Sequence, residues 1–144
     1  EIFTQQLKNC TSWFVELLKD PYVGTNPAWF KVFVYLEVFL HLPFFLAAMY
    51  AFAKGGRHWI KIPSIIWSVQ VITMTLQMVY VILNDDFSNY KTKVVPETLE
   101  ERYQLAGCYL CFVIIPICLL VYMLTSQKYN NLESSAFVKK VKKN

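Results

Sequence analysis

Residues 28–53 read AWFKVFVYLEVFLHLPFFLAAMYAFA, a stretch long and apolar enough to cross a lipid bilayer as one helix. Its carboxylate near the middle is Glu37, which follows Trp29 by eight positions and so lies about 12 Å along the helix axis. The hydrocarbon core of a bilayer is about 30 Å thick, which places Glu37 well inside it. Because an ionisable group is costly at that depth, we expect it to face a bundle interior or cavity and to have a partner.

Two further residues of this span bear on Glu37. His41 lies one helical turn beyond it, and residues four positions apart share a helix face. Pro43 lacks a backbone N–H and its ring clashes one turn back, which predicts a kink near residues 39–42. The predicted kink therefore falls beside the carboxylate and the imidazole.

The composition indicates a membrane protein rather than a soluble domain. Of the 144 residues, 56% are hydrophobic and 17% are aromatic, and the mean hydropathy is +0.34. The formal net charge of +4 comes mainly from basic residues in the ranges 54–61 and 128–143, which flank apolar segments. Basic residues placed in this way set membrane topology, so we predict no nucleic-acid partner.

The cysteines and histidines predict neither a cofactor nor a metal site. Cys108 and Cys111 form a C-x-x-C pair, but its neighbours are tyrosine, leucine and phenylalanine rather than electropositive groups that activate a thiol. Small apolar helix residues are the simpler interpretation. Two histidines without clustered ligands do not match the usual spacing of metal sites.

The other segments predict an all-α membrane protein, a helical bundle. Residues 1–20 mix apolar and charged residues at helical spacing, which predicts an amphipathic helix at the membrane surface or packed on the bundle. Residues 62–83 and 103–124 predict two more transmembrane helices. We expect one transmembrane domain over residues 1–130, with three spans.

The distribution of positive charge predicts the topology. Three spans place the basic loop 54–61 and the C-terminal tail 131–144 on the same, cytosolic side. Residues 1–27 and 85–101 then lie in the lumen or outside the cell. A chain that starts on that side needs either an N-out insertion or a further upstream helix. Because it begins with Glu1 rather than methionine, we expect the upstream helix, which gives four spans in all.

Two features of the sequence leave alternatives open. Gln70, Thr73 and Gln77 form a polar stripe on the second span, which indicates either hydrogen bonds between helices or a cavity wall opposite Glu37. The basic tail indicates either a solvated run that contacts anionic lipid or, through Lys140 and Lys142, a dilysine-type signal for retrieval to the endoplasmic reticulum.

Several stretches resemble the EXPERA family, which includes the emopamil-binding sterol isomerase and the sigma-2 receptors. The resemblance covers essentially residues 1–130 with near-constant spacing. It rests on the following motifs: KDP at 19–21, PAWFK at 27–31, LPFF at 42–45, YAFAKG at 50–55, II and SV within 65–69, DDFS at 85–88, PETLEER at 96–102 and IIP at 114–116.

The resemblance implies a location, ligands and partners. It implies a four-helix, multi-pass protein of the endoplasmic reticulum membrane, found also in endosomal and nuclear membranes and usually homodimeric. It implies binding of sterols and cationic amphiphilic molecules and a role in cholesterol homeostasis and trafficking. Lysosomal cholesterol transport proteins are the implied protein partners.

The resemblance also implies site residues. In the family, an acidic residue in a helix upstream of this chain and the one matching Glu37 form the amine site, and a glutamine stands where this chain has His41. Asp20 matches a lumenal acidic residue that supports the pocket entrance, and it could equally be a helix-end residue before a proline. The positions matching the pocket lining are Phe14, Cys108, Tyr109 and Phe112; of these all but Tyr109, and also His41, depart from the family's residues.

Three functional hypotheses follow for Glu37. In the first, the chain is a binding protein in which Glu37 is the counter-ion of a ligand ammonium, and Tyr109 and Phe112 add cation–π contacts. In the second, Glu37 and His41 are the acid and base of a sterol double-bond isomerase, although one helical turn places both on the same side of a substrate. In the third, Glu37 and His41 are a buried structural pair.

Overall fold

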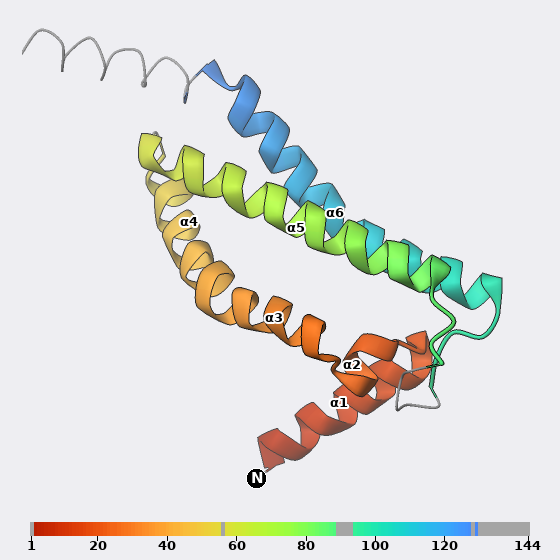
Figure 1. Cartoon of the computed structure of the whole chain (residues 1–144). Helices are drawn as coiled ribbons and strands as arrows, with labels where there is room; N and C mark the ends of the chain where they lie inside the picture. The colour runs from red at the N-terminus through yellow and green to blue at the C-terminus, as the bar shows by residue number, and fades with distance from the viewer. Residues whose placement is uncertain (1, 56, 89–93, 128, 130–144) are drawn as a thin grey trace, which may run out of the picture. The chain divides into compact units, whose positions relative to one another are not determined.

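The computed structural model describes residues 2–55, 57–88, 94–127 and 129, and every regular element among them is helical, which confirms the predicted all-α class. Figure 1 shows the elements in chain order. They are α1 (Ile2–Leu18), α2 (Pro21–Thr25), α3 (Ala28–Leu36), the π-helical turn η1 (Glu37–His41), α4 (Leu42–Lys54), the 3₁₀ turn η2 (His58–Ile60), α5 (Lys61–Asn84) and α6 (Leu99–Thr125).

Three helical segments are long and apolar enough to cross a membrane. They run over Ala28–Lys54, His58–Asn84 and Leu99–Thr125, each with 27 residues. Between 17% and 33% of the most apolar window of each segment is buried inside the chain, so the apolar residues that remain outside need lipid or protein to cover them. The chain is therefore a multi-pass membrane protein.

The last of these segments starts four residues earlier than predicted, because a capping box precedes it. Thr98 Oγ1 accepts a hydrogen bond from the backbone N–H of Glu101 at 3.2 Å, and Glu101 Oε2 accepts one from the backbone N–H of Thr98 at 3.4 Å. Such reciprocal bonds satisfy N–H groups that the first helical turn leaves without partners. The helix is thereby extended into the polar loop.

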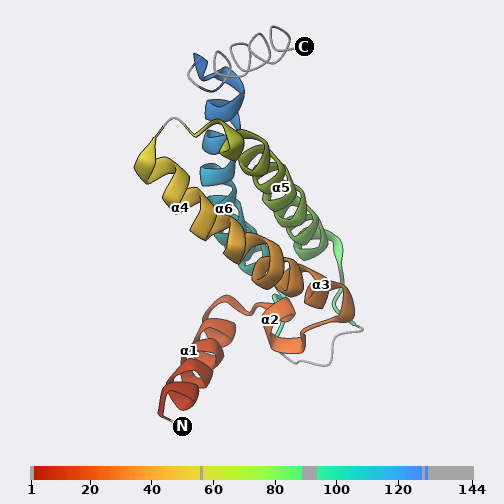
Figure 2. The ribbon, with the colours of Figure 1, turned by 90° about the vertical axis from the view of Figure 1, so that its left-hand side faces the viewer.

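Pro43 disturbs the first span in a specific way. Figure 2 shows α3 running into α4 without a break in the helical path, yet Glu37–His41 between them is a π turn. The backbone N–H of Leu42 donates to the carbonyl of Glu37, five residues back rather than four. Because Pro43 has no N–H and its ring crowds the preceding turn, the helix widens just ahead of it. The predicted kink region therefore overlaps a widened turn that carries Glu37 and His41.

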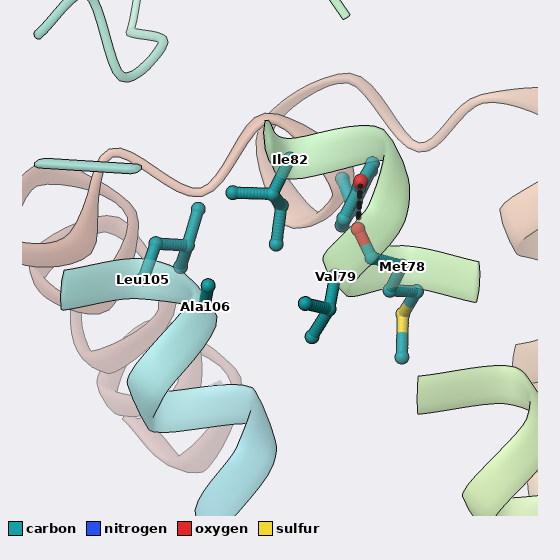
Figure 3. Packing of buried hydrophobic residues seen from close by; sticks show 6 residues of the cluster. Met78, Val79, Ile82, Leu105 and Ala106 are labelled. Atoms are coloured by element: carbon teal, nitrogen blue, oxygen red, sulfur yellow. Dashed lines mark hydrogen bonds between the residues drawn. The ribbon is translucent and has the colours of Figure 1, made fainter. Parts of the chain in front are cut away.

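The chain divides into two compact units, and the first comprises residues 1–34 and 74–112. Its core joins Tyr22 of α2 to α5 and α6, and the Tyr22 hydroxyl donates to the carbonyl of Met78 at 2.8 Å (Figure 3). Tyr22 and Ile82 are fully buried. A large ring with a satisfied hydroxyl thus ties the short helix α2 to the end of a span. The other buried members are Met78, Val79, Leu105 and Ala106.

The second unit comprises residues 35–73 and 113–144. Its core, among the described residues, is built around Ile60 and Met123, both fully buried. Ala48 and Ala51 of α4 belong to the same cluster, and such small residues let helices approach closely inside a membrane. This packing positions the part of α5 that carries the site residues of this unit.

Candidate functional site

The π turn η1 carries Glu37 and His41, the pair from which the sequence predicts ligand recognition. The Glu37 side chain is exposed, whereas only 5% of the His41 surface is exposed. Glu37 and His41 lie on one π turn, and the Gln70 side chain of α5 lies near the same imidazole ring. The turn thus combines a carboxylate that other molecules can reach with an imidazole held by its neighbours.

Trp67 of α5 organises the aromatic side chains next to this turn. Its ring stacks on Phe44, with centroids 5.2 Å apart and an interplanar angle of 18°. The rings of Phe45 and His41 form T-shaped pairs with the Trp67 ring, with centroid distances of 5.5 and 6.2 Å. Sequence reasoning missed Trp67, although its position three residues before Gln70 puts both on neighbouring parts of one helix face.

The predicted polar stripe on α5 does not act as one surface. Gln70 is half-buried beside His41, as a hydrogen-bonding group between helices would be. Thr73 is exposed, and its hydroxyl donates to the carbonyl of Val69 in its own helix at 2.8 Å. Gln77 is also exposed and belongs to the first unit. Within the second unit, only Gln70 of the stripe therefore lies against the candidate site residues.

Asp20 organises a second group, in the first unit. It is fully buried and caps α2, where its Oδ1 accepts hydrogen bonds from the backbone N–H groups of Tyr22 at 2.8 Å and Val23 at 3.3 Å. Its Oδ2 accepts a hydrogen bond from the Tyr109 hydroxyl of α6 at 2.6 Å. A buried carboxylate is tolerated when hydrogen-bond donors surround it in this way. Asp20 is thus a helix-end residue that also fixes a tyrosine ring.

The predicted pocket-lining residues differ in exposure and in whether a hydrogen bond fixes their orientation. Tyr109 is half-buried, and its ring meets Tyr22 edge-on with centroids 6.2 Å apart. Cys108 and Phe112 are exposed on α6. Phe14 belongs to α1, but its side chain lies outside the described part of the chain, as do Lys140 and Lys142. Of the lining residues, Tyr109 is the one whose orientation is fixed by a hydrogen bond.

Arg102 is a further residue that sequence reasoning did not single out, although it ends the PETLEER motif. Its Nη1 donates to the carbonyls of Ile82 at 3.1 Å and Asp85 at 2.6 Å, and its guanidinium lies 5.0 Å from the centre of the Phe87 ring. These carbonyls lie at the C-terminal end of α5, where a helix lacks its own donors and favours positive charge. Arg102 therefore holds the end of α5 against α6.

Lys19 and Glu101 join the end of α1 to the start of α6. The Lys19 ammonium donates to Glu101 Oε1 at 2.5 Å, and this hydrogen bond, with the charge of Glu101, raises the pKa of Lys19 above its ordinary value of 10.5. A cation whose pKa is raised by folding stabilises the folded state below its unfolded pKa, and the stabilisation is lost as the pH rises through the folded value.

We therefore expect Lys19→Met to lower the thermal unfolding midpoint at neutral pH but not in strong alkali. The difference between the wild type and the variant should stay constant up to about pH 9 and shrink above about pH 10.5, where Lys19 loses its proton. Thermal unfolding of both proteins in one detergent across this range measures it, because other titrating groups affect both alike. A difference that persists in strong alkali would contradict the role of the ammonium.

The two groups offer different chemistry. The η1 turn provides an exposed carboxylate, which attracts a cation strongly in surroundings of low dielectric constant. Trp67 and Phe44 beside it provide flat apolar surfaces of the kind that line small-molecule sites. The Asp20 group provides a positioned phenol ring. The carboxylate and rings at the η1 turn, taken by themselves, suit the recognition of a largely apolar ligand with a cationic end.

Comparison with known proteins identifies the family. Residues 6–123 match the family described as EXPERA, the expanded EBP superfamily. The chain is 39% identical over 132 residues to Sigma intracellular receptor 2 of Homo sapiens, which covers 90% of this chain and 74% of that protein. It is 37% identical over 132 residues to the Xenopus tropicalis protein of the same name, which covers 92% and 77%. The resemblance predicted from the motifs is confirmed, and the chain belongs to the EXPERA superfamily.

Proposed function

We propose that this protein is a membrane receptor that binds sterols and cationic amphiphilic molecules, with Glu37 as the counter-ion of a ligand ammonium. The observation that supports it most is the exposed Glu37 carboxylate at the π turn of a membrane-spanning segment. An ionisable residue inside a span is costly, and such residues usually mark functional sites. A protonated amine would neutralise this carboxylate, while the apolar body of the ligand would lie against ring surfaces.

The other site residues enter the proposal through the family pattern. Tyr109 and Phe112 would offer ring faces to the ligand, and Cys108 and Phe14 would contact its apolar part. Asp20 would act on the ligand indirectly, because its Oδ2 fixes the Tyr109 hydroxyl. His41 replaces the family's glutamine, so ligand preference should differ from that of relatives with glutamine at this position.

The cellular part of the proposal rests on the family as well. We propose that the protein lies in the endoplasmic reticulum membrane, forms a homodimer and takes part in cholesterol homeostasis and trafficking with lysosomal cholesterol transport proteins. Lys140 and Lys142 would supply the retrieval signal.

Direct binding tests the proposal. The purified protein in lipid nanodiscs is titrated with a tritiated tertiary amine of the cationic amphiphilic class, and cholesterol is added as a competitor. Saturable binding that cholesterol displaces is expected. If the amine binding does not saturate, or is unaffected by cholesterol at any concentration, the proposal is wrong.

A sterol double-bond isomerase is the second candidate, and the placement of Glu37 and His41 on the same π turn is the observation that favours it. Such a reaction adds a proton to one carbon and removes one from another, and two acid–base groups on one helical turn could divide these tasks. Incubation of the purified protein with a Δ8 sterol, followed by chromatography of the products, distinguishes the two. A shifted double bond that depends on both residues would favour the enzyme, and unchanged sterol would leave the binding role.

A further inference from the structure

Several polar atoms of the second unit are buried and lack a partner. They are Nε2 of His41, Nε1 of Trp67 and the Oγ atoms of Ser64 and Ser68, none of which has a hydrogen-bond partner among the described residues. Ser64 and Ser68 are fully buried, and 5% of the His41 surface is exposed. Buried polar groups are almost always hydrogen-bonded in folded proteins. A set of unpaired buried atoms in one place therefore indicates that a bound molecule supplies their hydrogen-bond partners.

These atoms come from neighbouring positions. Ser64, Trp67 and Ser68 are spaced three and four residues apart on α5, which places them along one side of the helix. The His41 ring meets the Trp67 ring at 6.2 Å, with an interplanar angle of 78°. The Trp67 ring also packs on the rings of Phe44 and Phe45. The unpaired atoms therefore belong to one polar patch inside an aromatic setting.

Close packing of helices accounts for the size of the serines but not for their hydroxyls. Alanine would let α5 approach its neighbours as closely and would bury no polar atom. A hydroxyl inside a helix commonly donates to the backbone carbonyl four residues back. Thr73 and Thr125 do so, at 2.8 and 2.7 Å. Ser64 and Ser68 make no such bond.

The chemistry of the patch selects the kind of group it can hold. The Trp67 indole only donates, so it needs an acceptor. His41 Nε2 and the serine hydroxyls either donate or accept according to their partner. An anion is disfavoured because the Glu37 charge acts on the same imidazole, and an ammonium could not accept the Trp67 proton. An uncharged group that both donates and accepts, which is a hydroxyl, satisfies the patch.

We propose that His41, Ser64, Trp67 and Ser68 form a subsite for the hydroxyl group of an uncharged, otherwise apolar ligand such as a sterol alcohol. The inference rests on the proposed binding function and assigns it a second polar subsite, separate in its chemistry from the amine counter-ion Glu37. The ligand's hydroxyl accepts from the Trp67 indole N–H and makes two further hydrogen bonds, one donated and one accepted, with His41 Nε2 and the serine hydroxyls.

A matched pair of sterols tests the subsite. Cholesterol and cholest-5-ene, which lacks only the hydroxyl, compete against a tritiated tertiary amine on the full chain in nanodiscs. The wild type should bind cholesterol about tenfold more tightly than cholest-5-ene, the discrimination that one or two net hydrogen bonds provide. Water alone at the patch would give equal affinities for the two sterols, which would overturn the proposal.

Variants locate the effect. Trp67→Phe keeps a ring beside Phe44 but removes the N–H, and Ser68→Ala removes a hydroxyl without adding volume; each should lower the preference for cholesterol about threefold or more. Thr125→Val and Trp59→Phe are matched controls, because the Thr125 hydroxyl is already bonded within its helix and Trp59 is exposed. Both controls should keep the wild-type preference. Equal preference in Trp67→Phe, Ser68→Ala and wild type would also overturn the subsite.

The same titration separates this inference from the function on which it depends. Saturable amine binding that is weakened by Glu37→Gln, together with equal affinities for the two sterols, would remove the hydroxyl subsite and leave the receptor. An absence of saturable amine binding would instead overturn the receptor. Circular dichroism of each variant in the same nanodiscs shows whether the helices are intact.

Discussion

Replacing Glu37 with glutamine is expected to weaken the binding of a tertiary amine about 100-fold, while the affinity for cholesterol changes no more than about threefold. The exposed Glu37 carboxylate lies in a membrane-spanning segment, where a charge pair is screened less than in water. Glutamine keeps the size and the hydrogen-bonding atoms of the side chain but removes its charge. An uncharged sterol has no charge for Glu37 to pair with.

The measurement is the ratio of the two dissociation constants, obtained by competition on purified protein in nanodiscs. Glu100→Gln is the matched control, since Glu100 is an exposed glutamate at the start of α6 and the substitution makes the same change of net charge. It should leave both affinities near those of the wild type. A Glu37→Gln protein that keeps its amine affinity would show that Glu37 is not the counter-ion.

The second large effect concerns stability. Asp20→Ala is expected to lower the free energy of unfolding by about 2–5 kcal/mol, because it removes the cap of α2 and also removes the carboxylate to which the half-buried Tyr109 hydroxyl donates. The thermal unfolding midpoint in detergent measures the loss. Folding and ligand contact should both suffer, since the Tyr109 ring loses the bond that orients it.

Two variants divide this effect into its parts. Tyr109→Phe removes only the hydroxyl that donates to Oδ2, and should cost less than Asp20→Ala, about 1 kcal/mol. Asp86→Ala is the control, because Asp86 also accepts hydrogen bonds in a turn, from Ser88, but at an exposed position. If Asp20→Ala destabilises no more than Asp86→Ala, the buried carboxylate does not have the role assigned to it.

The spans could be predicted from the sequence because contact with lipid depends on local composition. A run such as residues 28–53 needs no knowledge of its neighbours to be recognised as apolar and long. The relation of Glu37 to His41 was equally local, since both lie within one turn. Pro43 predicted where the helix would be distorted but not that the distortion would be a π turn, because a proline is compatible with either a bend or a widened turn.

The residues that were missed depend on contacts between distant parts of the chain. Trp67 belongs to the site because Phe44 and His41 pack on it, and nothing in the neighbouring sequence specifies those partners. Arg102 donates to carbonyls of Ile82 and Asp85 at the end of α5, which lie 20 and 17 residues away. Periodicity placed Thr73 in a polar stripe, but the direction of its hydroxyl follows from a bond with its own helix. Pattern alone cannot supply such information.

The two carboxylate oxygens of Asp20 make the short helix α2 and the Tyr109 ring thermodynamically linked. One oxygen holds the first turn of α2 and the other holds the phenol, so a change at either is transmitted to the other through a single rigid group. Linkage of this kind is reciprocal: whatever free energy a molecule on Tyr109 adds to α2, the ordering of α2 adds to the binding of that molecule. The short helix before the first span is therefore coupled energetically to a residue inside the third.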